Sequence, residues 1–431
     1  MARNRRRRRL GGALGAGALA LGATGCWPAP GQGPNRDAYN PLETTLTAAN
    51  VATLTEAWSA PLDGPTFVPV HNPSAELVTG HGAVYVNDAG ALYRLDAATG
   101  ARDWRWPIPD AFPPDHAPEM AQPFVVGDRL LAAYGSHGDL ASQDAEWHTV
   151  WLDPATGGVV AEGPIDAIPV AIRGDRIAGV HASCGDLAFC SAKFVVADLD
   201  DGTPLATGDH GPHVYNFEPS TLGEERLYHS GVDVSSVSSR IQAFPLDGGR
   251  GAVPPLWTRI IQFQGPATGP VLGADGSVLY TTSGGTTGGG RITALDAATG
   301  DVLWTGDLGA TVGAPPALAE GRLYVPTRDG DLLVFDAAGC GAATCAPLWA
   351  ADGGTDLRVQ PAVAGGVVYT GSEDGTVAAF PADGCGASTC PPLWSAAAGR
   401  PVVAAPIVSN ARLHVYAAGG GAGEVVTYAL P

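Results

Sequence analysis

Short runs of alternating apolar and polar residues fill this chain from about residue 36 to its end, and turn pairs such as Asp-Gly and Gly-Gly break them at close intervals. Alternation with a period of two, bounded by turn residues, is typical of β-strands in which one face is more buried than the other. Beyond residue 25 no window shows sustained helical periodicity. The pattern therefore predicts an all-β protein.

A long internal repeat shows how these strands are organised. The segment from Gly321 to Trp349 recurs 45 residues later, from Gly366 to Trp394, and 15 of the 29 positions are identical. Each copy reads as part of a four-stranded antiparallel meander that is apolar on both faces, so it must stack on neighbours to be stable. A period of about 40–50 residues built from strands is typical of a β-propeller blade.

The turns and the tryptophans that recur at one phase of the repeat give the number of blades. A β-sandwich would also contain short strands and frequent turns, but it does not require a tryptophan at a fixed phase. We interpret these tryptophans as packing between blades. We predict an eight-bladed β-propeller of four-stranded antiparallel blades; seven blades are the alternative, because residues 107–208 match the repeat poorly. The predicted blades are 64–106, 107–163, 164–208, 209–260, 261–308, 309–352, 353–397, and 398–431 closed by an N-terminal strand around Val51 to Trp58.

The first 25 residues read as an export signal. An arginine-rich start is followed by a 14-residue apolar run, Leu10 to Ala23, which is well short of the ~20 residues that span a bilayer. The small residues before Cys26 resemble a lipobox, although Ala23 stands where that motif prefers leucine. We expect residues 1–25 to be a signal peptide, Cys26 to be acylated, residues 26–35 to be a tether, and residues 36–431 to form the propeller. The export route, Sec or twin-arginine, is left open, as is secretion without the lipid.

Loss of the leader would make a strongly acidic chain. Its 18 Lys and Arg would face 43 Asp and Glu, a net charge of −25, and Lys193 would be the only lysine. No basic patch remains, which argues against nucleic acid or an anionic membrane surface as a partner. We interpret the acidic surface as a source of solubility, and we expect a monomer that contacts the membrane through its N-terminal lipid alone.

Three turns carry the motif Leu-Asp-x-x-Thr-Gly, at residues 95–100, 152–157 and 295–300, and in two of them a tryptophan follows four residues later. Asp296 and Thr299 can bond local amides, and Gly300 can adopt the positive φ that closes the turn. With the segment Asn50 to Trp58, these motifs resemble the pyrroloquinoline-quinone (PQQ) repeat propellers. That family includes quinoprotein alcohol dehydrogenases and the lipoprotein propeller of the outer-membrane barrel-assembly machinery. The resemblance covers nearly all of residues 36–431 and implies the propeller fold.

The six cysteines after Cys26 form three local pairs, as is typical of disulfides in an exported chain. Zinc binding is the competing interpretation, but the Cys-x-x-Cys spacing that favours a zinc site is missing. We predict three disulfides, Cys184–Cys190, Cys340–Cys345 and Cys385–Cys390.

Polar residues before the innermost strands suggest a ligand site at the mouth of the central channel. Aligning the blades on the proline of that strand places Glu76, Gln122, Glu218 and Gln360 there. The competing interpretation is a solvated rim without a specific ligand. The histidines show no metal-ligand spacing, and we expect them in surface loops: His71, His81, His116, His137, His148, His181, His210, His213, His229 and His414.

The expected function is that of a non-catalytic exported propeller that binds a protein partner or a small ligand, with no cofactor or metal. The alternative is a dehydrogenase of alcohols or sugars that uses PQQ and calcium. Many family dehydrogenases place an adjacent Cys-Cys pair beside the cofactor and build their active sites from long insertions between blades. This chain has neither, and it also lacks a Cys-x-x-Cys-His haem motif. A hydrolase with Glu76 and Glu218 as an acid pair is a further enzymatic alternative.

Overall fold

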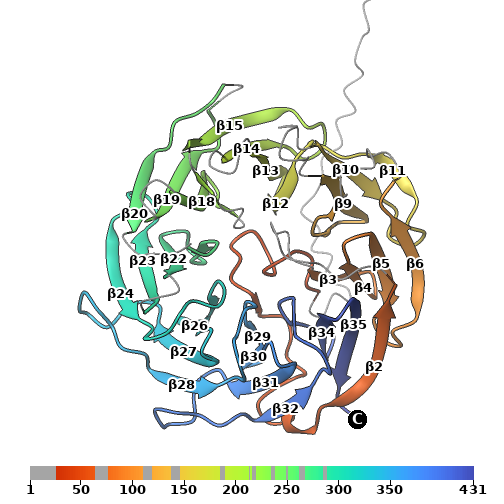
Figure 1. Cartoon of the computed structure of the whole chain (residues 1–431), viewed down its shortest axis with the longest axis vertical. Helices are drawn as coiled ribbons and strands as arrows, with labels where there is room; N and C mark the ends of the chain where they lie inside the picture. Colours follow the sequence, from red (N-terminus) through yellow and green to blue (C-terminus); the bar gives the residue numbers. More distant parts are fainter. Residues whose placement is uncertain are drawn as a thin grey trace, which may run out of the picture.

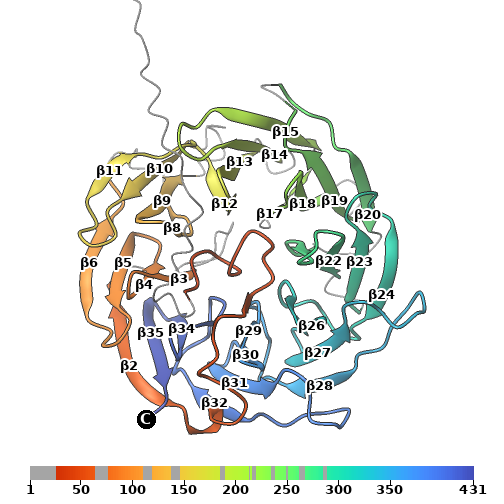
Figure 2. The ribbon, with the colours of Figure 1, turned by 180° about the vertical axis from the view of Figure 1, so that it is seen from behind.

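In the computed structural model, eight antiparallel sheets stand around one axis and form a closed ring (Figure 1). Seen from behind, the colours of the sequence run once around this ring (Figure 2). The described residues are 26–63, 76–109, 119–136, 146–184, 190–212, 214–215, 220–233, 238–248, 251–261, 267–284 and 289–431. The prediction of an eight-bladed propeller is confirmed.

In the first four blades the strands pair in chain order, and blades 2 and 4 have an inner strand that is split in two. Blade 1 consists of β3 (Leu77–Gly80), β4 (Ala83–Asn87), β5 (Ala91–Asp96) and β6 (Arg102–Pro107); blade 2 of β7 (Glu119–Met120), β8 (Phe124–Val126), β9 (Arg129–Ser136), β10 (Glu146–Leu152) and β11 (Val159–Glu162); blade 3 of β12 (Ile168–Arg173), β13 (Arg176–Cys184), β14 (Cys190–Asp198) and β15 (Pro204–Pro212); blade 4 of β16 (Val214–Tyr215), β17 (Thr221–Leu222), β18 (Arg226–Asp233), β19 (Ser238–Pro245) and β20 (Trp257–Ile261).

The last four blades follow the same order, with β1 (Tyr39–Asn40) added in parallel to the inner edge of blade 7. Blade 5 consists of β21 (Val271–Leu272), β22 (Val278–Ser283), β23 (Arg291–Asp296) and β24 (Val302–Asp307); blade 6 of β25 (Ala317–Ala319), β26 (Arg322–Pro326), β27 (Asp331–Asp336) and β28 (Trp349–Asp352); blade 7 of β29 (Ala362–Ala364), β30 (Val367–Gly371), β31 (Thr376–Pro381) and β32 (Trp394–Ala397); blade 8 of β33 (Ile407–Ser409), β34 (Arg412–Gly419), β35 (Ala422–Ala429) and β2 (Thr55–Leu62).

Blade 8 joins the two ends of the chain. A 3-10 turn, η1 (Val51–Thr53), leads into β2, which pairs with β35 from Thr55 opposite Ala429 to Leu62 opposite Gly423. The predicted closure by N- and C-terminal strands is therefore confirmed. Closure pairs the outer edge of β35 with a strand from the start of the chain, so the ring has no end blade with an open face.

Six of the eight blades carry a tryptophan in the outer strand that packs on the next blade; the outer strands of blades 2 and 3, β11 and β15, have none. Trp304 of blade 5 is buried, and its Nε1 donates to the carbonyl oxygen of Ala337 in blade 6 at 3.3 Å. Tyr280 Oη donates to the same oxygen at 3.0 Å. The interpretation of these tryptophans as packing between blades is confirmed at the equivalent bonds, which join Trp58 to Ala97, Trp104 to Pro154, Trp257 to Ala297 and Trp394 to Leu54 at 3.0–3.2 Å.

A glycine in the turn of the next blade receives the indole ring. Gly300 has a φ of +74°, and a Cβ at this position would lie 2.6 Å from the Trp257 ring. The turn itself is closed by Asp296, whose Oδ1 accepts the amides of Ala298 and Thr299 at 2.9 and 2.8 Å. The motif Leu-Asp-x-x-Thr-Gly thus supplies a tight turn and a flat surface for the indole of the preceding blade.

Two of the predicted disulfides, Cys340–Cys345 and Cys385–Cys390, are confirmed, each with a Cα–Cα distance of 5.6 Å. Both lie in the hairpin between the last two strands of a blade. The side chains of Cys184 and Cys190 lie outside the described part of the structure.

The disulfide hairpins also reach back to the preceding blade. In blade 6 the amide of Cys345 donates to the Thr305 oxygen at 2.7 Å, and the amide of Thr305 donates to Ala343 at 2.9 Å. Blade 7 repeats this arrangement around Ala350. Each hairpin therefore forms a short parallel bridge with the outer strand of the preceding blade. The tryptophan of the same blade packs on the following blade, so each of these blades is joined to both neighbours.

Residues 26–40, which we call the N-terminal strap, run along the inner strands instead of leaving the propeller. Trp27 is 1% exposed, and its carbonyl oxygen accepts the amide of Thr79 in blade 1 at 2.7 Å. Carbonyl oxygens of the strap accept amides from five further inner strands at 2.8–3.2 Å: Pro28 from Val125, Pro34 from Leu222, Asn35 from Leu272, Asp37 from Leu318 and Ala38 from Val363.

These contacts do not fit the expected tether at residues 26–35, because the strap belongs to the packed structure of the propeller. All six donors lie near the turns that join the first and second strands of their blades. The strap therefore marks one end of the channel, which we call the turn face. Within the described residues, no helix is long and apolar enough to cross a membrane.

Candidate functional site

Two of the residues predicted at the channel mouth bond to neighbouring inner strands. Gln122 Nε2 donates to the carbonyl oxygen of Pro169 in blade 3 at 2.9 Å. Gln360 Nε2 donates at 2.8 Å both to Pro316 in blade 6 and to Arg36 in the strap. Both side chains are buried. Their amides thus connect blades to each other and to the strap.

The two predicted glutamates are not seen together. Glu76 is largely buried at the start of blade 1, and its amide donates to Asn87 Oδ1 at 3.2 Å. Glu218 lies outside the described residues. The acid pair that a hydrolase would need is therefore a prediction that the described residues leave open.

The expectation of surface loops fits His81, which lies in a turn, but not the other histidines whose side chains are described. His148 and His181 lie in strands β10 and β13, and His229 and His414 are buried in strands. His229 in β18 is 1% exposed, and its Nδ1 lies 2.9 Å from Ser220 Oγ. His414 in β34 is completely buried, with Nδ1 2.8 Å from Thr427 Oγ1. Desolvation lowers the pKa of each imidazole to about 3, and Arg412 adds to this shift at His414. His71, His116, His137 and His213 lie outside the described residues, and of His210 only the backbone is described.

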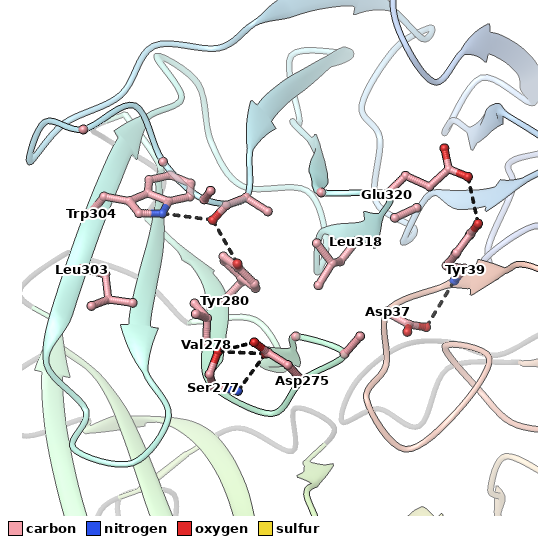
Figure 3. Close-up of a pocket in the computed structure, with 18 of the residues that line it drawn as sticks. Asp37, Tyr39, Asp275, Ser277, Val278, Tyr280, Leu303, Trp304, Leu318 and Glu320 are labelled. Carbon is pink, nitrogen blue, oxygen red and sulfur yellow. Dashed lines mark hydrogen bonds between the residues drawn. The ribbon is translucent and has the colours of Figure 1, made fainter.

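A groove of about 960 Å³ opens on the turn face between blades 5 and 6 (Figure 3). One side is the turn between β21 and β22, and the opposite side is the turn between β25 and β26 together with the strap. The hairpin between β27 and β28 closes the outer end. The residues that line it are Asp37, Tyr39, Gly273, Ala274, Asp275, Ser277, Val278, Tyr280, Leu303, Trp304, Leu318, Ala319, Glu320, Gly321, Ala337, Ala338, Gly339, Gly341, Ala342 and Ala343.

Three carboxylates from three distant segments give the groove its charge. Tyr39 connects two of them, because its hydroxyl donates to Glu320 Oε1 at 2.9 Å and its amide donates to Asp37 Oδ1 at 3.3 Å. The third, Asp275, accepts the Ser277 hydroxyl at 2.8 Å and the Ser277 amide at 3.0 Å. Asp37 and Asp275 lie on opposite sides of the opening (Figure 3).

The carboxyl groups differ in their electrostatic environment. Burial raises the pKa of Asp37 to about 6, although the Tyr39 amide and the more distant Arg173 guanidinium act in the opposite direction. Hydrogen bonds from Ser277 lower the pKa of Asp275. Burial and the bond to Glu320 raise the pKa of Tyr39 to about 12, so its hydroxyl stays protonated and remains a donor at neutral pH.

The rest of the groove is apolar or made of small residues. Leu303 is 48% exposed beside the opening, and Leu318 projects into it from β25 (Figure 3). Trp304 and Tyr280 form a buried floor whose polar atoms already bond to Ala337. The hairpin wall of glycines and alanines is held by the Cys340–Cys345 disulfide and by the bridge to Thr305. The groove therefore combines an apolar wall with negative charge, and no aromatic ring of Trp304 or Tyr280 is exposed in it.

Sequence reasoning missed this groove, because its residues come from the strap, from two blade turns and from one hairpin. Asp37 and Tyr39 could be recognised only once the strap was known to follow the channel. The turn residues are at repeat positions that look like ordinary solvent-exposed turns. A smaller cavity of about 240 Å³ lies next to the groove, between blades 4 and 5, and shares Gly273 to Asp275 with it.

The described residues provide no ligand set for the calcium that the dehydrogenase alternative would use with PQQ. Among them, no three His, Cys, Asp or Glu side chains lie close enough together to hold a metal ion. The chain has no adjacent Cys-Cys pair of the kind that many family dehydrogenases place beside PQQ. The two described disulfides lie instead in outer hairpins, and each joins cysteines five positions apart. We therefore derive no reaction step through PQQ.

Solved structures share the fold at low sequence identity. The quinohemoprotein alcohol dehydrogenase from Comamonas testosteroni matches with a TM-score of 0.65 at 15% identity, over 95% of this chain and 81% of that chain. A europium-containing methanol dehydrogenase matches with 0.63 at 14% identity, over 94% and 98%. BamB from Moraxella catarrhalis matches with 0.53 at 17% identity, over 87% and 97%. At these identities the likeness concerns the fold alone.

The family is shown by sequence. No curated protein matches the chain. The profile of the family described as outer membrane protein assembly factor BamB matches residues 37–204, 237–341 and 338–429, which is well over half of the chain. Together with the eight blades and the Leu-Asp-x-x-Thr-Gly turns, this match shows that the protein belongs to the BamB family of PQQ-like repeat propellers.

Proposed function

We propose that this protein is an exported, lipid-anchored, non-catalytic propeller that acts as an interaction module for another protein or a small ligand. The observation that carries the proposal is the groove on the turn face, which is large and open and has no Cys, His or metal-ligand set among its described lining residues. Its polar groups are arranged to recognise a ligand, because the carboxylates are fixed by Tyr39 and Ser277 and the wall is fixed by a disulfide. Membership of the BamB family fits this role, but fold and family do not by themselves establish function.

The lipid anchor would attach at the start of the strap. Cys26 is partly exposed, and burial raises the pKa of its thiol. Trp27, the next residue, is buried and bonded to Thr79. An acyl chain on Cys26 would therefore hold the propeller close to the membrane, with the turn face near the lipid.

Replacement of Cys26 by serine is expected to release the protein from membranes, because the acylated sulfur would be lost while Trp27 and the rest of the strap stay in place. The measurement is the partition between membrane and soluble fractions after carbonate washing, with the wild type and Cys340→Ser/Cys345→Ser as controls that keep Cys26. A Cys26→Ser protein that remained entirely in the membrane fraction would refute the anchor.

A calorimetric titration with PQQ and Ca²⁺ is expected to give no saturable heat, because the described residues provide no metal site. The protein used should retain the complete strap, residues 26–40, since the strap bonds to six blades. Saturable binding at low micromolar PQQ would contradict the non-catalytic assignment and favour the dehydrogenase of alcohols or sugars.

A further inference from the structure

We propose that the groove between blades 5 and 6 binds an extended segment of a partner protein in which an arginine or lysine stands beside aliphatic side chains. The inference rests on the proposed function, because it names the partner chemistry for the interaction module. It concerns one local site and not the general acidity of the surface.

The charge of the groove is unbalanced. Its lining includes Asp37, Asp275 and Glu320, and none of the described residues that line it is Arg, Lys or His. Arg173, whose charge acts on Asp37, is already bonded to Asn35, to the Leu222 oxygen at 2.6 Å and to Glu224 at 2.8 Å. A cation entering the groove would therefore meet carboxylates without a competing positive charge, and it would form charge-assisted hydrogen bonds with them.

The apolar part of the groove fits the neighbours of such a residue. Leu303 and Leu318 provide aliphatic contact close to the carboxylates. Gly341, where an added Cβ would have no atom within 4 Å, and the small Ala342 leave room for the backbone of a bound chain to approach the hairpin wall. An extended peptide can place a basic side chain among the acids and an aliphatic side chain against the leucines.

Other ligand classes fit less well. A sugar is usually held against an exposed aromatic ring, but Trp304 and Tyr280 are only 4% and 5% exposed. A phosphate would be repelled by the three carboxylates. The adjoining cavity between blades 4 and 5 extends the surface and favours a chain over a compact amine. That cavity contains both Glu224 and Arg226, so the preference for a cation belongs to the larger groove.

The test is a selection of random dodecapeptides displayed on phage against the purified propeller. Enriched peptides are expected to carry Arg or Lys next to Leu, Ile or Val. A synthetic copy of the enriched peptide should bind the Asp37→Asn/Glu320→Gln variant about tenfold more weakly or worse, since each lost charge removes a charge-assisted bond. Both substitutions keep the oxygen that accepts from Tyr39, so the local structure is retained.

Two further variants complete the design. Asp175→Asn/Asp200→Asn makes the same change of net charge at carboxylates that are more than 80% exposed on blade 3, and it should leave binding within about twofold of the wild type. Leu303→Ser, at an exposed position, should weaken binding without affecting the fold. Thermal unfolding of each variant verifies that it is folded.

Three outcomes would overturn the inference: no enrichment over the starting library, enriched peptides without basic residues, or equal binding by the wild type and the Asp37→Asn/Glu320→Gln variant. The proposed function is tested separately by the partition of Cys26→Ser and by the titration with PQQ, so its failure would be distinguishable from failure of this site.

Discussion

Replacement of Trp304 by alanine is expected to lower the free energy of unfolding by about 3–5 kcal/mol, as is typical when a large buried aromatic side chain is removed. The indole is 4% exposed and fills the interface between blades 5 and 6. It lies against Gly339, where an added Cβ would be 2.7 Å from the ring, and it stacks on Phe335 at a centroid distance of 6.3 Å. Its removal would also leave the Ala337 oxygen with one hydrogen-bond donor fewer.

Urea-induced unfolding, followed by circular dichroism, measures this loss. Trp304→Phe should cost less than the alanine variant, because it keeps an aromatic ring at the interface, although the bond to Ala337 is lost. Leu303→Ala is the matched control at the adjacent position of β24, where the side chain is half exposed, and it should cost about 1 kcal/mol or less. A loss below about 1 kcal/mol for Trp304→Ala would mean that the tryptophan is not a principal link between these blades.

The same interface explains why the fold could be predicted from the sequence. A tryptophan of one blade needs a flat turn in the next, and that turn needs a glycine with positive φ and an aspartate to bond its amides, as at Gly300 and Asp296. The tryptophan recurs in the outer strands of six of the eight blades, so it leaves a periodic signal of specific residue types; blades 2 and 3, which match the repeat poorly, lack it. Blade number, ring closure and the outer disulfides follow from repeat spacing in the same way.

The strap and the groove leave no such signal. The strap bonds to the blades through its own carbonyl oxygens, which every residue possesses, so a Pro- and Gly-rich stretch reads as a linker even though Trp27 is buried. Asp37 reaches Asp275 and Glu320 only because the strap circles the channel. His414 was predictable in part, since it occupies the repeat position of Tyr324 and Tyr369, which are buried.

Acidification from pH 7 to pH 5 is expected to destabilise the protein by about 2 kcal/mol for each of His229 and His414. Both imidazoles have a pKa of about 3 in the folded protein, against 6.5 for the ordinary side chain. Between these values the unfolded chain binds protons that the folded protein does not, so stability falls as the pH falls through this window. The cause is burial: a charged imidazole at either position would lose its hydration, and the hydroxyls of Ser220 and Thr427 cannot replace it.

Two carboxyl groups with shifted pKa values, Asp37 and Asp374, also affect how stability changes with pH. Asp37 has a raised pKa of about 6, so its folded form binds a proton more readily than the unfolded chain and offsets about 1 kcal/mol of the loss at pH 5. Asp374 has a pKa lowered to about 2 by its bonds to Ser372 and Thr376, against the desolvation that acts in the other direction. Its contribution is lost below about pH 4, outside this window. His229, His414 and Asp37 together should therefore give a loss of about 3 kcal/mol between pH 7 and pH 5, and His181, whose pKa burial also lowers, acts in the same direction.

The His414→Gln variant separates this contribution from general acid effects. Glutamine does not titrate, so the loss of unfolding free energy between pH 7 and pH 5 should be about 2 kcal/mol smaller than in the wild type, even if the variant is less stable at both values. His229→Gln, at the other buried imidazole, should reduce the loss by a similar amount. Urea titrations at pH 7, 6 and 5 give the free energy of unfolding of each protein at each pH. If His414→Gln and the wild type lost the same free energy over this range, the buried imidazole would have to be charged or hydrated in the folded protein, and the interface between blades 8 and 1 would be more open than its contacts with Trp58 and Thr427 indicate.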